Sequence, residues 1–287
     1  MRLSGRTRAA GRLLCGAAIA CLACALAGCR GSTGAHAVVV AGSTSVQPVA
    51  ELIAEHYEVQ SPGSPVNVQG GGSTAGVKAT LDGAADIGMI SRELKSEETG
   101  LTKIAIARDA VAFIVHPTNP IAGLSSGQAR AIYAGEATHW SELTGAPPGA
   151  AARRGDAITV ITREEGSGTR SAFEEGVMEQ TDLTPRALVQ DSTGTVRAIV
   201  ASDRNAIGYI SLGMVTPEVR PMPFEGVTPT VEAVASGRYA LARSFYFITK
   251  GEPDAAARAF IDYALGPDGQ ALVEAAGYIP IAGGGVQ

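Results

Sequence analysis

The chain has 287 residues, enough for one large domain or two modest ones that each bury a hydrophobic core. Hydrophobic residues make up 45% of the chain and charged residues 18%, which excludes an intrinsically disordered protein. The formal net charge is −5, so we expect no nucleic-acid partner and no polybasic membrane surface.

The N-terminal segment has the pattern of a secretion signal. Four arginines and no acidic residue stand before an apolar run, Leu13–Leu26, which is shorter than the ~20 residues that span a bilayer. The run leads into Leu-Ala-Gly-Cys, which resembles the lipobox of bacterial lipoproteins and ends at Cys29. We therefore expect residues 1–28 to be a signal peptide and Cys29 to be the lipidated first residue of the mature chain. The alternative is an ordinary cleavable signal in which Cys29 is incidental.

Removal of this segment would change both the charge and the cysteine content. Residues 29–287 carry 19 basic and 28 acidic side chains, a net charge of −9, and retain only one of the four cysteines. A single cysteine excludes a disulfide within the mature monomer and a cysteine-based metal site. The four histidines are widely spaced, so we expect no metal and no cofactor.

From residue 37 onward, short apolar strands alternate with amphipathic helices. The pattern predicts strands at 37–41, 66–68, 86–90, 109–115, 157–162, 207–210 and 244–249. It predicts helices after the first two strands, the first with His56 on its apolar face, and further helices at about 169–180, 253–265 and 267–276. Trp140 is expected in the core. This alternation predicts an α/β fold with largely parallel sheets.

Three predicted strands end in turns rich in glycine, serine and threonine, and a helix follows each turn. The turns are Gly42–Ser45, Gly70–Thr74 and Glu165–Thr169. Glycine lets the backbone approach a ligand, and a helix N-terminus offers free N–H groups and partial positive charge to an anion. Helix capping explains any one turn, but three such turns with Arg163 nearby indicate an oxyanion site. A fourth turn, at 191–195, is assigned to helix capping alone.

The motifs resemble one known family. Gly-Ser-Thr-Ser at 42–45, Gln-Gly-Gly-Gly-Ser-Thr at 69–74, Asp-Ile-Gly at 86–88 and Arg-Glu-Glu-Gly-Ser-Gly-Thr at 163–169 occur in its order. The chain is similar, over essentially all of residues 37–280, to the periplasmic phosphate-binding (PstS-like) component of the bacterial phosphate ABC transporter. The resemblance implies a two-lobed type II periplasmic-binding-protein fold with phosphate in the cleft between the lobes.

The resemblance also implies a domain plan and a set of ligands. Residues 29–36 would be a tether, residues 37–113 and 243–287 the first lobe, and residues 114–242 the second, with crossings near 112–115 and 240–244. Motif matching implies phosphate ligands from both lobes. They are Thr44, Ser45 and Ser73 in the first lobe, and Arg163, Ser167, Gly168 and Thr169 in the second.

One position departs from the family pattern. Better-known members have an aspartate in the loop after Asp-Ile-Gly, where it accepts the proton of hydrogen phosphate, whereas this chain has Ser91 followed by Arg92. Ser91 is kept as a site residue, but a serine does not repel a dianion such as sulfate, so selectivity for phosphate stays open. Glu165 is either a substitute acceptor or a salt-bridge partner that supports Arg163. Arg92 is either a second anion ligand or a solvated surface charge.

We expect a monomeric solute-binding lipoprotein that captures inorganic phosphate by hinge closure and delivers it to the membrane permease of an ABC transporter. Its place would be the cell envelope, lipid-anchored to the outer face of the cell membrane or periplasmic. One alternative is a binding protein for another tetrahedral oxyanion or a phosphate ester. Another is a secreted serine hydrolase or phosphatase using Ser73 or Ser167, but neither serine stands in a Gly-x-Ser-x-Gly motif and neither has a nearby His–Asp pair in the sequence.

Overall fold

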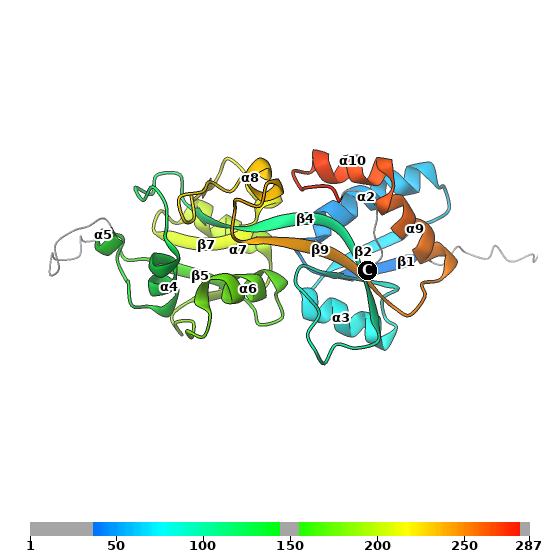
Figure 1. Ribbon diagram of the computed structural model, residues 1–287, viewed down its shortest axis with the longest axis horizontal. Coiled ribbons are helices and arrows are strands. Elements are labelled where there is room, and N and C mark those ends of the chain that lie inside the picture. Colours follow the sequence, from blue (N-terminus) through cyan, green and yellow to red (C-terminus); the bar gives the residue numbers. More distant parts are fainter. Residues whose placement is uncertain (1–36, 144–154, 282–287) are drawn as a thin grey trace, which may run out of the picture. The chain divides into compact units, whose positions relative to one another are not determined.

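The structure is a computed structural model that describes residues 37–143 and 155–281 (Figure 1). The predicted signal peptide, Cys29 and the tether at 29–36 lie outside the described residues. Among those that are described, no helix is long and apolar enough to cross a membrane.

The strands follow one hydrogen-bonded order, β2-β1-β3-β9-β4-β7-β5-β6, and β8 pairs with β4 to one side of that path. Their bounds are β1 (Val38–Gly42), β2 (Val66–Gly70), β3 (Ile87–Ile90), β4 (Leu101–Val115), β5 (Thr159–Arg163), β6 (Leu188–Gln190), β7 (Ala206–Ser211), β8 (Arg220–Pro221) and β9 (Ala242–Lys250).

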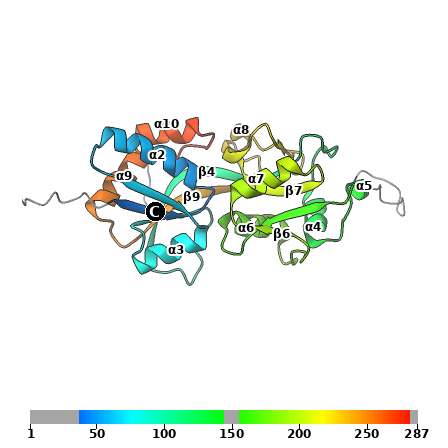
Figure 2. The same cartoon turned by 180° about the vertical axis from the view of Figure 1, so that it is seen from behind.

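The helices occupy the connections between these strands. Their bounds are α2 (Gln47–Gln60), α3 (Ser73–Asp82), α4 (Ser126–Ala134), α5 (Trp140–Leu143), α6 (Gly168–Phe173), the π-helical η1 (Glu174–Met178), α7 (Thr193–Ser202), the 3₁₀ turn η2 (Leu212–Met214), α8 (Val231–Ala235), α9 (Ala255–Leu265) and α10 (Pro267–Ala275). Helices α2, α9 and α10 pack together, as Figure 2 shows from behind. The single helix expected at 169–180 consists of two segments, α6 and the π-helical η1 that directly follows it.

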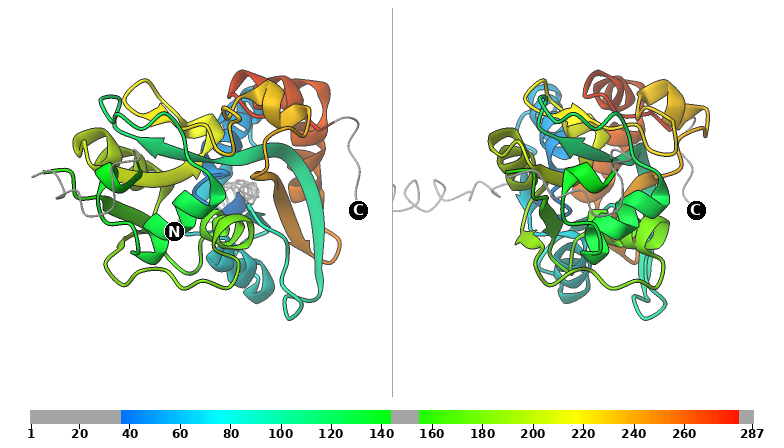
Figure 3. Two further views of the ribbon diagram at one scale, coloured as in Figure 1. Left: turned by 60° about the vertical axis from the view of Figure 1, so that its left-hand side comes forward. Right: turned by 90° about the vertical axis from the view of Figure 1, so that its left-hand side faces the viewer.

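The long strand β4 links the two halves of the structure, and Figure 3 shows its curved course. Its first part pairs antiparallel with β9, from Leu101 opposite Lys250 to Ala110 opposite Ala242. Its last part pairs antiparallel with β7.

The expectation of largely parallel sheets is therefore wrong. Strands β1, β2 and β3 run parallel, as do β5, β6 and β7, but β9 lies antiparallel between β3 and β4. The chain leaves the first half along β4 and returns to it along β9, and this return makes β9 antiparallel to its neighbours.

Two large hydrophobic cores lie on either side of this crossing. One draws its buried residues from 38–107 and 245–278, and the other from 110–241 together with Ile279. Trp140 is buried in the second core, as expected. Helix α2 buries Val49, Ile53 and Tyr57, but His56 is exposed, contrary to expectation, because it lies at the edge of this buried face. Each core supports its own set of strand-to-helix turns, and the described chain forms two α/β lobes, as expected.

Candidate functional site

The glycine- and serine-rich turns of the two lobes meet at one place. Arg163 Nη2 donates to Thr44 Oγ1 at 3.1 Å, and Ser45 Oγ lies 2.8 Å from Thr169 Oγ1. Backbone atoms meet as well, because the Thr74 N–H donates to the Gly166 carbonyl at 3.0 Å. Residues that are more than 90 positions apart in the sequence thus form a single polar cluster.

Parallel pairing explains why the turns of the first lobe are neighbours. Strands β1, β2 and β3 point the same way, so the segments that follow them leave the sheet at the same edge. There Ser43 Oγ donates to Ser91 Oγ at 2.9 Å, and the Ser91 N–H donates to Ser73 Oγ at 3.1 Å. The structure therefore brings Ser73 and Ser91 to the edge that also carries Thr44 and Ser45.

Gly42 is required at this edge by its conformation. Its φ is +142°, and a Cβ there would lie 2.2 Å from the Met89 carbonyl oxygen. A side chain at residue 42 would push β1 away from β3 and would displace the turn that begins at Ser43.

Gly168 is required by the approach of the other lobe. A Cβ at this position would lie 2.4 Å from Ser73 Oγ and 2.6 Å from Ser91 Oγ. Both hydroxyls belong to the first lobe, whereas Gly168 begins α6 in the second. Ser167 caps α6, since its Oγ accepts from the Arg170 N–H at 3.3 Å, and its side chain is buried in the same contact region.

Arg163 is the last residue of β5 and only 1% of it is exposed. Its Nε and Nη2 donate to the two carboxylate oxygens of Glu164, each at 2.9 Å. This corrects the expected partner: Glu164 holds the guanidinium, while Glu165 is exposed. The reason is the turn after β5, closed by a bond from the Ser167 N–H to the Glu164 carbonyl, with Glu165 on its outer side.

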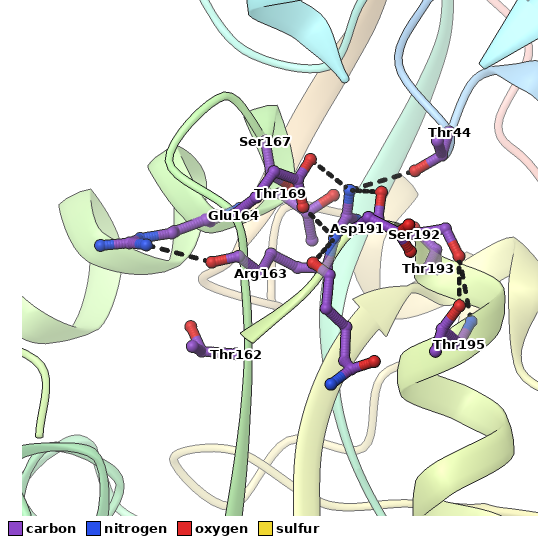
Figure 4. Close-up of polar contacts among 12 residues, drawn as sticks. Thr44, Thr162, Arg163, Glu164, Ser167, Thr169, Asp191, Ser192, Thr193 and Thr195 are labelled. Carbon is purple, nitrogen blue, oxygen red and sulfur yellow. Dashed lines mark hydrogen bonds and ion pairs between the residues drawn. The ribbon is translucent and has the colours of Figure 1, made fainter. Parts of the chain in front are cut away.

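The other edge of the guanidinium faces hydroxyl groups. Nη2 donates to Thr44 Oγ1, and Nη1 donates to Thr193 Oγ1 at 3.0 Å (Figure 4). Thr193 also lies 3.0 Å from Ser45 Oγ. The fourth Ser/Thr turn does cap a helix, because Ser192 accepts from the Thr195 N–H, but it contributes Thr193 to the cluster too. The sequence offered one signal for this role of Thr193. The turn follows β6, and because β6 is the parallel neighbour of β5, the segments after the two strands leave the sheet at the same edge.

Arg243, on β9, is a second buried cation that the motifs did not indicate. Its Nη1 donates to Thr169 Oγ1 at 2.9 Å, and its Nε donates to Asp109 Oδ2 at 3.0 Å. Burial raises the pKa of Asp109, although the positive charge of Arg243 acts to lower that pKa. Burial likewise lowers the pKa of Arg243, although the negative charge of Asp109 acts to raise that pKa. An arginine nevertheless remains protonated at neutral pH. Arg163 is therefore not the only full positive charge at the cluster.

Arg92 is not the solvated surface charge that one alternative supposed. It is buried, and its two terminal nitrogens donate to Glu98, each at 2.7 Å. Its Nη2 also donates to Thr74 Oγ1 at 3.2 Å. The ion pair with Glu98 and the contact with Thr74 account for the burial of Arg92.

The chemistry of the cluster is that of a binding site for an oxyanion. Hydroxyls, backbone N–H groups and two guanidinium groups supply donors and positive charge. The described histidines, His56, His116 and His139, form side-chain hydrogen bonds within their own segments and not with the serines of the cluster. Within residues 37–143 and 155–281, no group of three or more histidine, cysteine, aspartate or glutamate side chains is placed to hold a metal.

This fold and this site define the class of two-lobed periplasmic solute-binding proteins, which are not enzymes. A family model described as a PBP superfamily domain matches residues 29–268. The chain is 30% identical over 251 residues to the phosphate-binding protein PstS of Bacillus subtilis (strain 168), covering 85% of this chain and 80% of that relative. The chain belongs to the PstS-like family of phosphate-binding proteins.

Two solved structures are similar over most of the chain. A crystal structure of a putative phosphate ABC transporter substrate-binding protein from Clostridium perfringens, with bound phosphate, is 37% identical with a TM-score of 0.80, covering 86% of this chain and 100% of that one. An ABC-type phosphate transport receptor from Vibrio cholerae is 34% identical with a TM-score of 0.69, covering 85% of this chain and 100% of that one.

Proposed function

We propose that the chain binds inorganic phosphate between its two lobes and serves as the solute-binding component of a phosphate ABC transporter. One observation carries the proposal: the buried guanidinium of Arg163 turns one edge toward hydroxyls of both lobes, while Glu164 occupies the other edge. Similarity to phosphate-binding relatives supports the same ligand.

The proposed ligands come from both sides of the cluster. Phosphate would bind donors on one lobe first and then recruit donors from the other, which stabilises the closed form. The proposed phosphate-binding residues are Thr44, Ser45, Ser73, Ser91, Arg163, Ser167, Gly168 and Thr169.

Local donors have to supply the attraction. Residues 29–287 carry a net charge of −9, so the long-range field of the protein repels an anion. Glu164 takes up one edge of Arg163, and the free edge together with Arg243 supplies the positive charge nearby.

Ser91 sets how well phosphate is distinguished from other oxyanions. Ser43 donates to Ser91, so the Ser91 proton is available to a ligand or to Ser73, and no carboxylate stands at this position. A hydroxyl accepts the proton of hydrogen phosphate but does not repel sulfate. We therefore propose that sulfate competes with phosphate, and that arsenate binds as phosphate does.

Isothermal titration calorimetry tests this function. The mature chain, dialysed free of phosphate, should bind phosphate at a stoichiometry of one, and a planar anion such as nitrate serves as the control for charge alone. Sulfate and arsenate are titrated in the same buffer. Absence of phosphate binding by folded protein would contradict the proposed function, and equal binding of nitrate would contradict a site built for a tetrahedral anion.

We further propose that residues 1–28 direct export, that Cys29 carries the lipid and that residues 29–36 form a tether. The lipobox-like junction in the sequence supports this proposal. Anchoring would hold the protein close to the membrane permease that receives the phosphate. Mass spectrometry of membrane-extracted protein should find an acylated Cys29 at the mature N-terminus, and a mature chain that begins elsewhere would contradict it.

The lobe boundaries are also a proposal. Residues 37–113 and 243–287 would form the first lobe and residues 114–242 the second. The hydrophobic cores support a division close to these positions, because one core ends at Ala107 on β4 and the other begins at Ala110.

A further inference from the structure

We infer that Thr193 is an additional ligand-binding residue of this site and that its hydroxyl donates a hydrogen bond to the bound anion. The inference rests on the proposed function, binding of phosphate at Arg163. Thr193 lies outside the three turns that carry the family resemblance, and it is the first residue of α7.

The free edge of Arg163 locates Thr193 next to the anion. A guanidinium offers two edges for bidentate pairing, and Glu164 occupies the one formed by Nε and Nη2. The remaining edge is formed by Nη1 and Nη2. Thr193 Oγ1 stands at Nη1 of this edge, at 3.0 Å, and Thr44 Oγ1 stands at Nη2, at 3.1 Å. Figure 4 shows the Thr44 and Thr193 hydroxyls on this side of Arg163. An anion paired with this edge would lie beside both hydroxyls.

The loop before α7 is fitted around Arg163. The Gln190 carbonyl accepts from Nε at 3.3 Å, and the Asp191 carbonyl accepts from Nη2 at 3.4 Å. Thr193 itself is fully buried. This loop is thus a fourth element of the site, and its contacts fix where the Thr193 hydroxyl lies.

The position of the Thr193 proton follows from the available donors. Arginine has no acceptor, so Thr193 Oγ1 accepts from Arg163 and keeps its own proton to donate. Thr169 is in the same situation, because it accepts from Arg243 Nη1. Both threonine hydroxyls contact Ser45 Oγ, which has a single proton, so at least one threonine donates to it. Thr169 can make that donation, which leaves Thr193 Oγ1 to accept from Arg163 Nη1 and from Ser45 Oγ and to donate its own proton to an anion oxygen.

Helix capping does not account for this arrangement. Ser192 performs the capping of α7, because its Oγ accepts from the Thr195 N–H at 3.1 Å. The hydroxyl of Thr195 contacts Ser192 Oγ at 2.7 Å and so belongs to the cap. The hydroxyl of Thr193 contacts Arg163 and Ser45, which are both proposed ligands.

Calorimetry with inorganic phosphate on single variants tests the inference. Thr193→Val removes the hydroxyl at nearly constant volume and should weaken binding about 10- to 100-fold, the effect of one hydrogen bond to a charged group. Thr193→Ser keeps the hydroxyl and should restore most of the affinity. Thr195→Val is the matched control and should bind as the wild type does. Where valine disturbs folding, judged by circular dichroism, Thr193→Ala removes the same hydroxyl.

A double variant separates direct contact from support of Arg163. In an Arg163→Lys background, Thr193→Val should weaken phosphate binding further, because the contact with the anion is its own. No further loss would show that Thr193 acts only by orienting the guanidinium, and would overturn the inference. Wild-type affinity in folded Thr193→Val would overturn it as well. Failure of the wild type to bind phosphate would instead contradict the proposed function.

Discussion

Two adjacent glutamates after β5 have different environments although they look alike in the sequence. Both carboxylate oxygens of Glu164 accept hydrogen bonds from the buried Arg163, whereas Glu165 is exposed on the outer side of the turn. A family motif identifies the arginine, but it does not say which of two neighbouring carboxylates turns back toward it. That choice depends on the turn closed between Ser167 and Glu164.

Glu164→Ala should lower the stability of the phosphate-free protein by about 1–3 kcal/mol, since a buried guanidinium loses its bidentate partner. Glu165→Ala, the matched control, should stay within about 0.5 kcal/mol of the wild type. Urea unfolding monitored by circular dichroism measures both. A larger loss for Glu165→Ala than for Glu164→Ala would contradict the assignment of the ion pair.

The Arg92–Glu98 pair should make stability depend on pH. Burial acts to raise the pKa of Glu98, but hydrogen bonds from Arg92 and from the Lys95 N–H outweigh it, and the pKa lies below its ordinary value. A lowered pKa means that the pair contributes above about pH 4.5 and that its contribution is lost as the pH falls. The stability difference between wild type and Glu98→Gln should therefore be constant from pH 6 to 8 and shrink in acid. A difference that grows in acid would contradict this sign.

Two residues that sequence reasoning missed contact partners that are 30 and 74 positions away in the chain. Thr193 was assigned to a helix cap, and Arg243 received no role, because neither lies in a motif with the residue that it contacts. The burial of Arg92 depends on Glu98 and Thr74 together. A local pattern shows which residue types are available, and only the fold shows which of them meet.

At the scale of elements, the crossing strands connect the polar cluster with the backbone that joins the lobes. Asp109 on β4 and Arg243 on β9 are register partners, and Arg243 extends from there to Thr169. The Asp109 carboxylate also accepts from the Leu212 N–H. The Asp109–Arg243 ion pair thus joins β4 to β9 and also contacts Leu212, the first residue of η2 in the second lobe.

Asp109→Ala should destabilise the protein by about 3–5 kcal/mol, since it leaves Arg243 buried without its partner. The exposed pair between Glu252 and Arg258 provides the control, and Glu252→Ala should change stability by less than about 1 kcal/mol. Chemical denaturation of both variants measures the difference. Equal small effects would show that the crossing strands do not depend on the buried pair.

The elements themselves were largely predictable, because their signals are local. An apolar run such as 37–41 and an amphipathic pattern such as that of α9 need no distant partner to be recognised. The direction of β9 was not predictable in the same way. It depends on pairing with β3 and β4, more than 130 positions away in the chain, and nothing in residues 242–250 alone specifies antiparallel neighbours.

At the scale of the whole molecule, closure of the lobes depends on small residues where they meet. Gly168→Ala places a Cβ against Ser73 and Ser91, so it should hold the lobes apart and weaken phosphate binding at least 10-fold. Gly166→Ala is the control, because its Cβ would have nothing closer than Thr74 Cβ at 3.5 Å. Calorimetry measures affinity, and small-angle scattering should show phosphate-induced compaction of the wild type and of Gly166→Ala only. Normal affinity for Gly168→Ala would contradict closure at this contact.

The central claim is that Arg163 holds phosphate in a protein whose overall charge opposes anion binding. The most direct test is phosphate calorimetry on Arg163→Ala, with circular dichroism to verify folding. Loss of one partner from a buried charge pair costs about 2–5 kcal/mol, so affinity should fall roughly 30- to several-thousand-fold. Arg163→Lys, which keeps the charge but lacks the planar fork, should fall in between. A folded Arg163→Ala variant that binds phosphate as tightly as the wild type would remove Arg163 from the site.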